Sequence, residues 1–329
     1  MNQVFIDRSI AEFNYDPEIK PRVTINSGQS IIIETRDPRS GALLCGEPGT
    51  LQPYPPPPGG RSNALTGPIK VENAEPGDVL TIQIIKIEPA SIAYMAASDN
   101  GFILPKGSIE SAHVGIVAVK ERWIEFRDGI KFQKNTMVGC VGVAHPEKPK
   151  SGKTGDFGGN FDHSILKEDC TLFLPVFVTG GLLYVGDVHA AMGDGELSGG
   201  GVETAAVVEL KVNLIKNYLL TQPRFETENK VVTTGWSYDF HEARSMAVSD
   251  MLNIIVATMK VSTTEAMMLI SNAGDLRIGQ ACGSMEMTLR LEMNKFERME
   301  ALPRKRLIAI TLLVLNILLH RLLVLIWIT

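Results

Sequence analysis

The 329-residue chain lacks the features that mark nucleic-acid-binding and secreted proteins. Its net charge is −5, and no basic cluster is interleaved with aromatic residues, so we expect no nucleic-acid partner. The four cysteines, at positions 45, 140, 170 and 282, form no Cys-x-x-Cys pair, which excludes a zinc knuckle or dithiol motif of that kind. The N-terminus has no basic segment followed by an apolar stretch. We therefore expect no signal peptide, reduced thiols and a cytoplasmic protein.

A long hydrophobic run occupies residues 307–328 and follows Arg304-Lys305-Arg306. Its length is sufficient to span a bilayer, with the basic residues on the cytoplasmic side. Asn316, His320 and Arg321 oppose this interpretation, since an arginine in mid-span costs about 2.5–3.5 kcal/mol on insertion scales. A membrane anchor, a helix buried in an oligomer and a tail foreign to the domain all stay open. We favour the last two together over membrane contact.

Glycine and proline are plentiful, with 30 and 18 residues, and this composition is typical of many short strands joined by turns. Apolar and polar residues alternate over residues 22–35, and many of them are β-branched. With Asn26-Ser27-Gly28 as the turn, this pattern predicts a β-hairpin. Residues 36–61 contain many prolines and glycines and predict a long surface loop. The sequence contains no internal repeat.

The pattern changes after Arg224. Asp239 and Glu242 are spaced as a capping box that opens a helix running to about Met259, and Ser262 and Glu265 open a second helix ending before Gly274. We predict a mainly β fold: a β-sandwich body over residues 1–222, a smaller α+β segment over 223–300, and the apolar tail over 301–329.

The segment Gly186-Asp187-Val188-His189-Ala190-Ala191-Met192-Gly193-Asp194-Gly195-Glu196 gathers four ionisable side chains around two glycines. Asp187 and His189 are two residues apart and project from the same face of a strand. Asp194 and Glu196 repeat that spacing on an expected second strand beyond a turn at Gly193. Carboxylates and an imidazole at one sheet end suit a divalent metal or a general acid/base pair. A solvated turn is the alternative, since Asp and Gly are ordinary turn residues.

Over nearly all of residues 1–295 the chain resembles the acetamidase/formamidase family. The central match is residues 186–196, continuing to Gly201-Val202-Glu203. Further matches, in the expected order, are Thr66-Gly67-Pro68-Ile69, residues 71–80, His113-Val114-Gly115, residues 158–162 and residues 273–278. The sequence departs from the usual family pattern at Met192, where Gln is common, and at Ser198-Gly199-Gly200, where Cys-Gly-Thr is frequent.

The resemblance implies a β-sandwich with an α+β insertion, a homo-oligomer, and hydrolysis of short linear amides such as formamide and acetamide to carboxylate and ammonia. An unactivated amide needs an activated water, charge stabilisation on its carbonyl oxygen and a proton for the leaving amine. A divalent metal supplies the first two, and Zn²⁺ is the ion we expect. Amidases that use a Ser-Ser-Lys triad or a Cys-Glu-Lys triad fit less well, because no serine dyad and no αββα pattern are present.

We assign His113, Asp162, Asp187 and His189 as candidate metal ligands, and we assign Glu196 as general base and later acid. Asp194 would orient Glu196 or complete the metal site. His113 could equally be an ordinary polar residue on the surface. Asp162 could equally form an Asx turn instead of binding a metal. Glu203 is either a partner of the ligands or a charge at a strand edge.

Two rival functions remain at this point. One is a non-catalytic β-sandwich that binds a metal or small polar ligand with the same residues. The other is a membrane-attached protein in which the tail is the main functional element.

Overall fold

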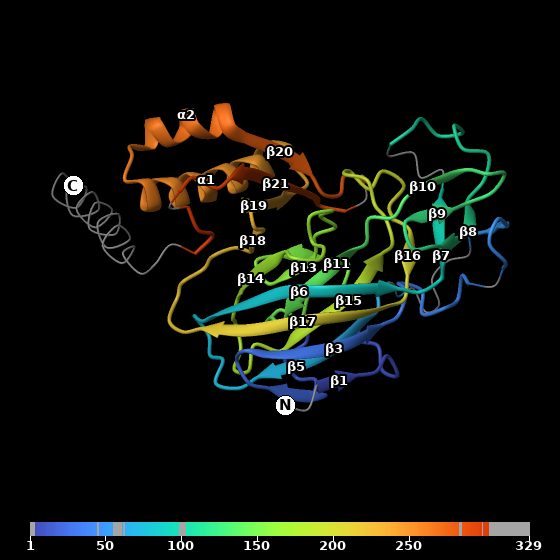
Figure 1. Cartoon of the computed structure of the whole chain (residues 1–329), viewed down its shortest axis with the longest axis horizontal. Helices are drawn as coiled ribbons and strands as arrows, with labels where there is room; N and C mark the ends of the chain where they lie inside the picture. Colours follow the sequence, from blue (N-terminus) through green and yellow to red (C-terminus); the bar gives the residue numbers. More distant parts are fainter. Residues whose placement is uncertain are drawn as a thin grey trace, which may run out of the picture.

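Two large β-sheets lie against each other in the computed structural model, which describes residues 4–44, 46–54, 61, 63–98, 103–282, 285–297 and 299–302 (Figure 1). The nine-stranded sheet has the order β1-β3-β17-β6-β14-β18-β19-β21-β20. Its strands are β1 (Val4–Ile6), β3 (Gln29–Thr35), β6 (Val79–Pro89), β14 (Thr171–Pro175), β17 (Ala206–Ile215), β18 (Arg224–Glu226), β19 (Lys230–Ser237), β20 (Gly274–Ile278) and β21 (Met287–Asn294).

The twelve-stranded sheet has the order β10-β9-β8-β7-β16-β15-β11-β13-β12, with β5 on β15, β2 on β5 and β4 on β8. Its strands are β2 (Val23–Ile25), β4 (Leu51–Pro53), β5 (Leu65–Val71), β7 (Ile92–Ala97), β8 (His113–Val119), β9 (Trp123–Glu125), β10 (Lys131–Gln133), β11 (Met137–Val143), β12 (Thr154–Gly155), β13 (Gly158–Asn160), β15 (Leu183–His189) and β16 (Glu203–Thr204). Strands β11 and β15 are buried along their whole length, so this sheet holds the candidate motif rigidly inside the molecule.

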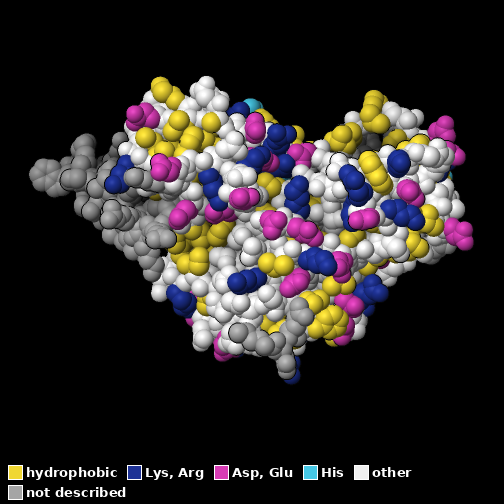
Figure 2. Space-filling view, in the orientation of Figure 1, with side chains coloured by type: hydrophobic (Ala, Val, Ile, Leu, Met, Phe, Trp, Pro, Cys, Tyr) yellow, Lys and Arg dark blue, Asp and Glu magenta, His cyan; other side chains and the backbone are white. Residues whose placement is uncertain are grey.

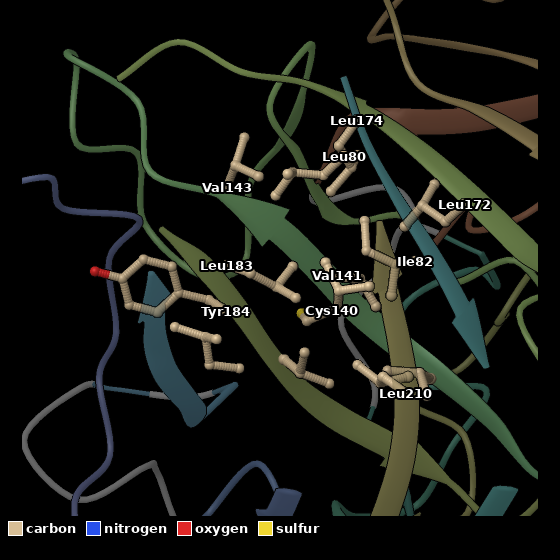
Figure 3. Packing of buried hydrophobic residues seen from close by; sticks show 14 of the residues in the cluster. Leu80, Ile82, Cys140, Val141, Val143, Leu172, Leu174, Leu183, Tyr184 and Leu210 are labelled. Carbon is tan, nitrogen blue, oxygen red and sulfur yellow. The ribbon is translucent and has the colours of Figure 1, made fainter. Parts of the chain in front are cut away.

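The main hydrophobic core fills the space between the two sheets. Figure 3 shows Leu80 and Leu210 of the nine-stranded sheet facing Val141 and Leu183 of the other, and all four are almost fully buried. Period-two alternation produces this arrangement, because every second side chain of a strand such as β17 points into the core. The predicted mainly β sandwich is therefore confirmed.

The predicted hairpin over residues 22–35 is wrong. Strand β2 pairs in parallel with β5, whereas β3 pairs with β1 and β17 of the other sheet. The turn is nonetheless present, with Gly28 at a φ of 89° and a hydrogen bond from the Gln29 amide to the Asn26 carbonyl. A turn signal specifies a reversal of the chain, and here that reversal carries the chain from one sheet to the other.

Both predicted helices are confirmed, and both cover the end of the nine-stranded sheet near the C-terminus (Figure 1). Helix α1 (Phe240–Met259) is capped by Asp239, whose carboxylate accepts from two amides of the first turn. Helix α2 (Thr263–Ala273) begins with the Ser262–Glu265 capping box and ends at Gly274. Strands β18 to β21 join the same nine-stranded sheet as β1, β3, β6, β14 and β17, so residues 223–300 extend the sandwich body without a break in pairing.

No single helix of the described residues is long and apolar enough to cross a membrane. Helices α1 and α2 satisfy that test only as a pair, and a 115° bend separates them. The tail over residues 303–329 lies outside the described residues, as do residues 55–60 of the predicted surface loop. On the face drawn in Figure 2, acidic and basic side chains are interspersed between apolar ones.

Candidate functional site

Strand β15 carries the first half of the motif into the interior. The Nε2 atom of His189 lies 3.6 Å from Asp187 Oδ1 and 3.1 Å from Glu203 Oε2. Glu203 is opposite His189 in the antiparallel pairing of β15 with β16, which brings its carboxylate to the imidazole. All three side chains are more than nine-tenths buried.

Two further carboxylates reach the same place from loops. One candidate ligand atom each from Asp162, His189 and Glu196 lies within 4.8 Å of the other two, and the same holds for Asp187, His189 and Glu203. We refer to these five residues as the acidic cluster. Asp162, Asp187 and Glu196 have φ values of 47°, 56° and 45°, a left-handed conformation that is uncommon for residues other than glycine. Such strain concentrates at functional sites, where the surrounding structure enforces it.

The predicted second strand bearing Asp194 and Glu196 is wrong. Gly195 makes only an isolated bridge to Gln280, and the Glu196 amide donates to the Gly193 carbonyl in a turn. The turn sends the two carboxylates in different directions, so the period-two argument does not apply there. Only Glu196 joins the acidic cluster.

Burial and mutual repulsion raise the pKa of three carboxyl groups in the cluster, those of Asp162, Glu196 and Glu203. Burial, reinforced by the neighbouring Asp187, raises the pKa of Asp162 to about 8. Burial, with repulsion from Asp162, also raises the pKa of Glu196 well above its usual value, and burial raises that of Glu203. For His189, burial alone would lower the pKa, but the Glu203 and Asp187 carboxylates raise it above its usual value.

Several polar atoms of the acidic cluster have no hydrogen-bond partner among the described residues. They are Asp162 Oδ1, Glu196 Oε2, Glu203 Oε2 and both ring nitrogens of His189. The close approach of His189 to Glu203 is thus an ion-pair distance without hydrogen-bond geometry. Unsatisfied buried polar atoms are costly, and a divalent cation bound between these carboxylate oxygens and one ring nitrogen of His189 would satisfy most of them. The donor set of the acidic cluster therefore fits a metal ion.

Amide side chains hold the carboxylates in place. Asn63 donates through Nδ2 to Asp187 Oδ2 at 2.8 Å, and Asn160 donates to Asp162 Oδ2 at 2.5 Å. Gly139 leaves room for both acids, because a Cβ there would collide with Asp162 Oδ1 and lie 2.8 Å from the Asp187 carbonyl oxygen. Asn63 and Gly139 were not predicted as site residues from the sequence. Asn160 lies within residues 158–162, which resemble the family and could have indicated a site residue, whereas no such motif includes Asn63.

His113 lies elsewhere. It is exposed at the start of β8, paired with Ala97 of β7, and its Nδ1 is 3.0 Å from Ser111 Oγ. Strands β7 and β16 separate β8 from β15, a lateral separation of roughly 14 Å for three strand spacings. The structure therefore does not bring His113 to the acidic cluster, and its position agrees with the surface alternative.

Asp194 belongs to a separate set of charges, the arginine network, which consists of Ser164, Asp194, Lys230, Arg290 and Glu292. Arg290 of β21 binds both carboxylate oxygens of Asp194, at 2.7 and 3.0 Å, and its Nε is 2.6 Å from Glu292 Oε1. Partial burial opposes ionisation of Asp194, yet hydrogen bonds from Arg290 and Ser164 hold its pKa below the usual value. This carboxylate is neutralised by its partners and is not placed to ligate an ion in the cluster.

A pocket of about 540 Å³ adjoins the acidic cluster. Strands β7 and β10 and the loop that follows β15 line it. Glu196 is the one member of the acidic cluster among its described lining residues. Glu196 is thus shared by the candidate metal site and the space where a small molecule could bind.

Comparison with known proteins identifies the family of the chain. The model of the acetamidase/formamidase family matches residues 6–154 and 151–272. The chain belongs to the acetamidase/formamidase family. The crystal structure of an acetamidase from Bacillus halodurans superposes with a TM-score of 0.82 at 32% identity, over 88% of this chain and 97% of that one.

Other members of the acetamidase/formamidase family match as well. The acetamidase of Yersinia enterocolitica superposes with a TM-score of 0.78 at 25% identity, over 89% of this chain and 93% of that one. A formamidase of Methylophilus methylotrophus is 38% identical over 76 residues, which are 22% of this chain and 19% of that protein. The chain spans about half, or less, of the length of the curated relatives that it matches. The aligned share is 53% for a putative formamidase of Schizosaccharomyces pombe and 16% for an acetamidase of Mycolicibacterium smegmatis.

Proposed function

We propose that this protein hydrolyses short linear amides to a carboxylate and ammonia. The observation that carries the proposal is the position of Glu196, which belongs to a buried cluster of metal-ligand side chains and also lines the adjoining pocket. Membership of a family whose relatives include an acetamidase and a formamidase supports the same chemistry.

Asp162, Asp187, His189 and Glu203 would hold a divalent cation, for which we favour Zn²⁺ because histidine nitrogen and carboxylate oxygen are among its usual ligands. When bound, such an ion lowers the pKa of a water molecule and polarises the amide carbonyl. Asn63 and Asn160 keep two of the carboxylates in position through the hydrogen bonds described above.

Glu196 would act as the general base and then as the general acid. Its carboxylate takes a proton from the attacking water as the new C–O bond forms. It then returns that proton to the amide nitrogen as the C–N bond breaks, which gives the carboxylic acid and ammonia. The acid then loses its own proton to ammonia or water and leaves as the carboxylate. The buried surroundings of Glu196 favour its protonated form, which suits the second step.

Ammonia release from formamide and acetamide, measured before and after chelation, tests this proposal. We expect turnover that is lost on chelation and restored by Zn²⁺ or another divalent ion. Turnover that persists after the metal content has fallen to zero would contradict the metal-assisted chemistry. Ligand binding without any turnover would favour the non-catalytic binding protein instead. Homo-oligomeric assembly and a cytoplasmic location stay predictions.

A further inference from the structure

The pocket beside Glu196 is much larger than formamide or acetamide requires. Its volume of about 540 Å³ falls within the range of cavities that enclose drug-sized ligands, roughly 300–1,000 Å³. A substrate of only a few heavy atoms would leave most of this space to water, so the shape of the pocket suggests a longer acyl group.

Much of the pocket lining is apolar. It includes Met95 of β7, Phe132 of β10, and Ala191, Met192 and Val202 from the loop around the motif. These side chains are continuous with a hydrophobic cluster of the twelve-stranded sheet: Ala191 and Val202 belong to it, and Met95 and Phe132 pack against it. An apolar wall of this kind stabilises hydrocarbon by removing it from water.

The same wall is rigidly held. The Ala190 amide donates to the Val202 carbonyl at 2.7 Å, and the Val202 amide donates to the Ala191 carbonyl at 2.8 Å. These two bonds close the neck of the loop that carries Met192 and Glu196. The apolar surface is therefore preformed, and a ligand does not have to order it on binding.

The polar groups of the pocket are confined to part of its lining. Glu196 and Asp194 are the acidic residues of the lining, and Asp194 is already bound by Arg290. Gln133, Asn135 and Ser198 supply neutral hydrogen-bonding groups. No lysine or arginine occurs among the described residues that line it. A neutral amide with its carboxamide at Glu196 and its hydrocarbon along the apolar wall matches this distribution, whereas an anionic substrate does not.

We propose that the site prefers primary amides with a medium-length aliphatic or aromatic acyl group over formamide and acetamide. Met192 is a specificity-determining residue, because it places a thioether in the wall close to the reacting group. This inference rests on the proposed amide hydrolysis. Each methylene removed from water on the apolar wall is expected to raise kcat/KM about fourfold, which corresponds to about 0.8 kcal/mol.

The test is kcat/KM for ammonia release from formamide, acetamide, butanamide, hexanamide and benzamide. We expect a rise along the aliphatic series and turnover of benzamide. Met192→Gln should flatten the series by placing a polar amide in the wall. The matched control is Met268→Gln on the exposed surface of α2, which should leave the series unchanged. A series that falls from formamide onwards, or that both variants change alike, overturns the proposal.

Calorimetric titration of Glu196→Gln with hexanamide and acetamide separates this inference from the proposed function. Tighter binding of hexanamide supports the apolar acyl site even if no amide is turned over by the unmodified protein. Equal or weaker binding of hexanamide overturns the acyl site even if acetamide is hydrolysed.

Discussion

Glu196 and Asp194 are separated by a single glycine, yet they enter opposite electrostatic environments. Glu196 joins carboxylates that share one imidazole, and its pKa is raised. Asp194 is bound by Arg290, and its pKa is lowered. A carboxylate that is neutralised by fixed cationic partners contributes to stability. Buried carboxylates without a cationic partner indicate a place where a metal ion binds or a reaction occurs. One sequence motif therefore contains a part that we propose to be catalytic, at Glu196, and a structural part, at Asp194.

The largest contrast is expected when each carboxylate is replaced by its amide. Glu196→Gln should lower kcat by about 10²–10⁴-fold, the usual contribution of a general base, while leaving the melting temperature unchanged or higher. Asp194→Asn should lower the melting temperature and retain most of kcat, because Asp194 contacts the arginine network and not the acidic cluster. Amidase assays and thermal unfolding of both variants test this, and equal loss of kcat in the two would contradict the division.

Removal of Arg290 from the arginine network should be the next largest effect. Arg290→Met leaves Asp194 without a cationic partner and Glu292 with Lys230 alone. Loss of one partner of a buried ion pair costs up to about 3–5 kcal/mol of stability.

Arg277→Met provides the matched control. Arg277 lies opposite Arg290 in the pairing of β20 with β21, but its ion pair with Asp275 is largely exposed. Denaturant unfolding should show a change within about 1 kcal/mol for the control. Similar losses in both variants would show that the network adds no special stability.

A smaller effect is expected at Gly139, which packs against Asp162 and Asp187 of the acidic cluster. Gly139→Ala places a methyl group against Asp162 and the Asp187 backbone, so we expect metal affinity to fall about 10–100-fold. Gly152→Ala is the control, since a Cβ there would meet nothing within 4 Å. Metal affinity is read from competition with a chromophoric chelator. Unchanged affinity in Gly139→Ala would remove Asp162 and Asp187 from the ligand set.

The smallest effect is a difference in pH dependence. The pKa of Asp162 is raised from 3.8 to about 8, so in metal-free protein its contribution to stability falls as the pH rises through that interval. Burial opposes ionisation of Glu292, but Lys230 and Arg290 hold its pKa below 4.5. Its contribution is complete above pH 4.5 and is lost on further acidification.

The melting temperature of chelated protein should therefore fall as the pH drops below 4.5 and also as the pH rises towards about 8. Asp162→Asn should reduce the decline at rising pH, and Glu292→Gln should reduce the decline at falling pH. If Asp162→Asn changed the decline at falling pH and Glu292→Gln the decline at rising pH, the contrast between the acidic cluster and the arginine network would be wrong.

Much of the fold was predictable from local signals. The caps at Asp239 and Ser262 defined the helices because capping depends only on neighbouring residues. Strand pairing was less predictable, because the turn at Gly28 reverses the chain without specifying which strand becomes its partner. Asp187 and His189 lie two residues apart on β15, as the alternation predicted, whereas Glu196 lies in a turn and outside any regular period.

The remaining site residues depended on distant contacts. His113 and Glu203 are single polar residues at strand ends, and nothing in their neighbours in sequence distinguishes the exposed one from the one paired with His189. Asn63 is brought to Asp187 only because β5 pairs with β15, which the sequence does not specify. These contacts arise from sheet order, which is a property of the whole chain.

The most direct test of the account is calorimetric titration of Zn²⁺ into chelated protein, with the melting temperature recorded before and after. We expect saturable binding and a higher melting temperature, and we expect Asp187→Asn to lose both. A melting temperature that Zn²⁺ leaves unchanged, with no measurable heat of binding for it or another divalent ion, would contradict the assignment of the acidic cluster as a metal site.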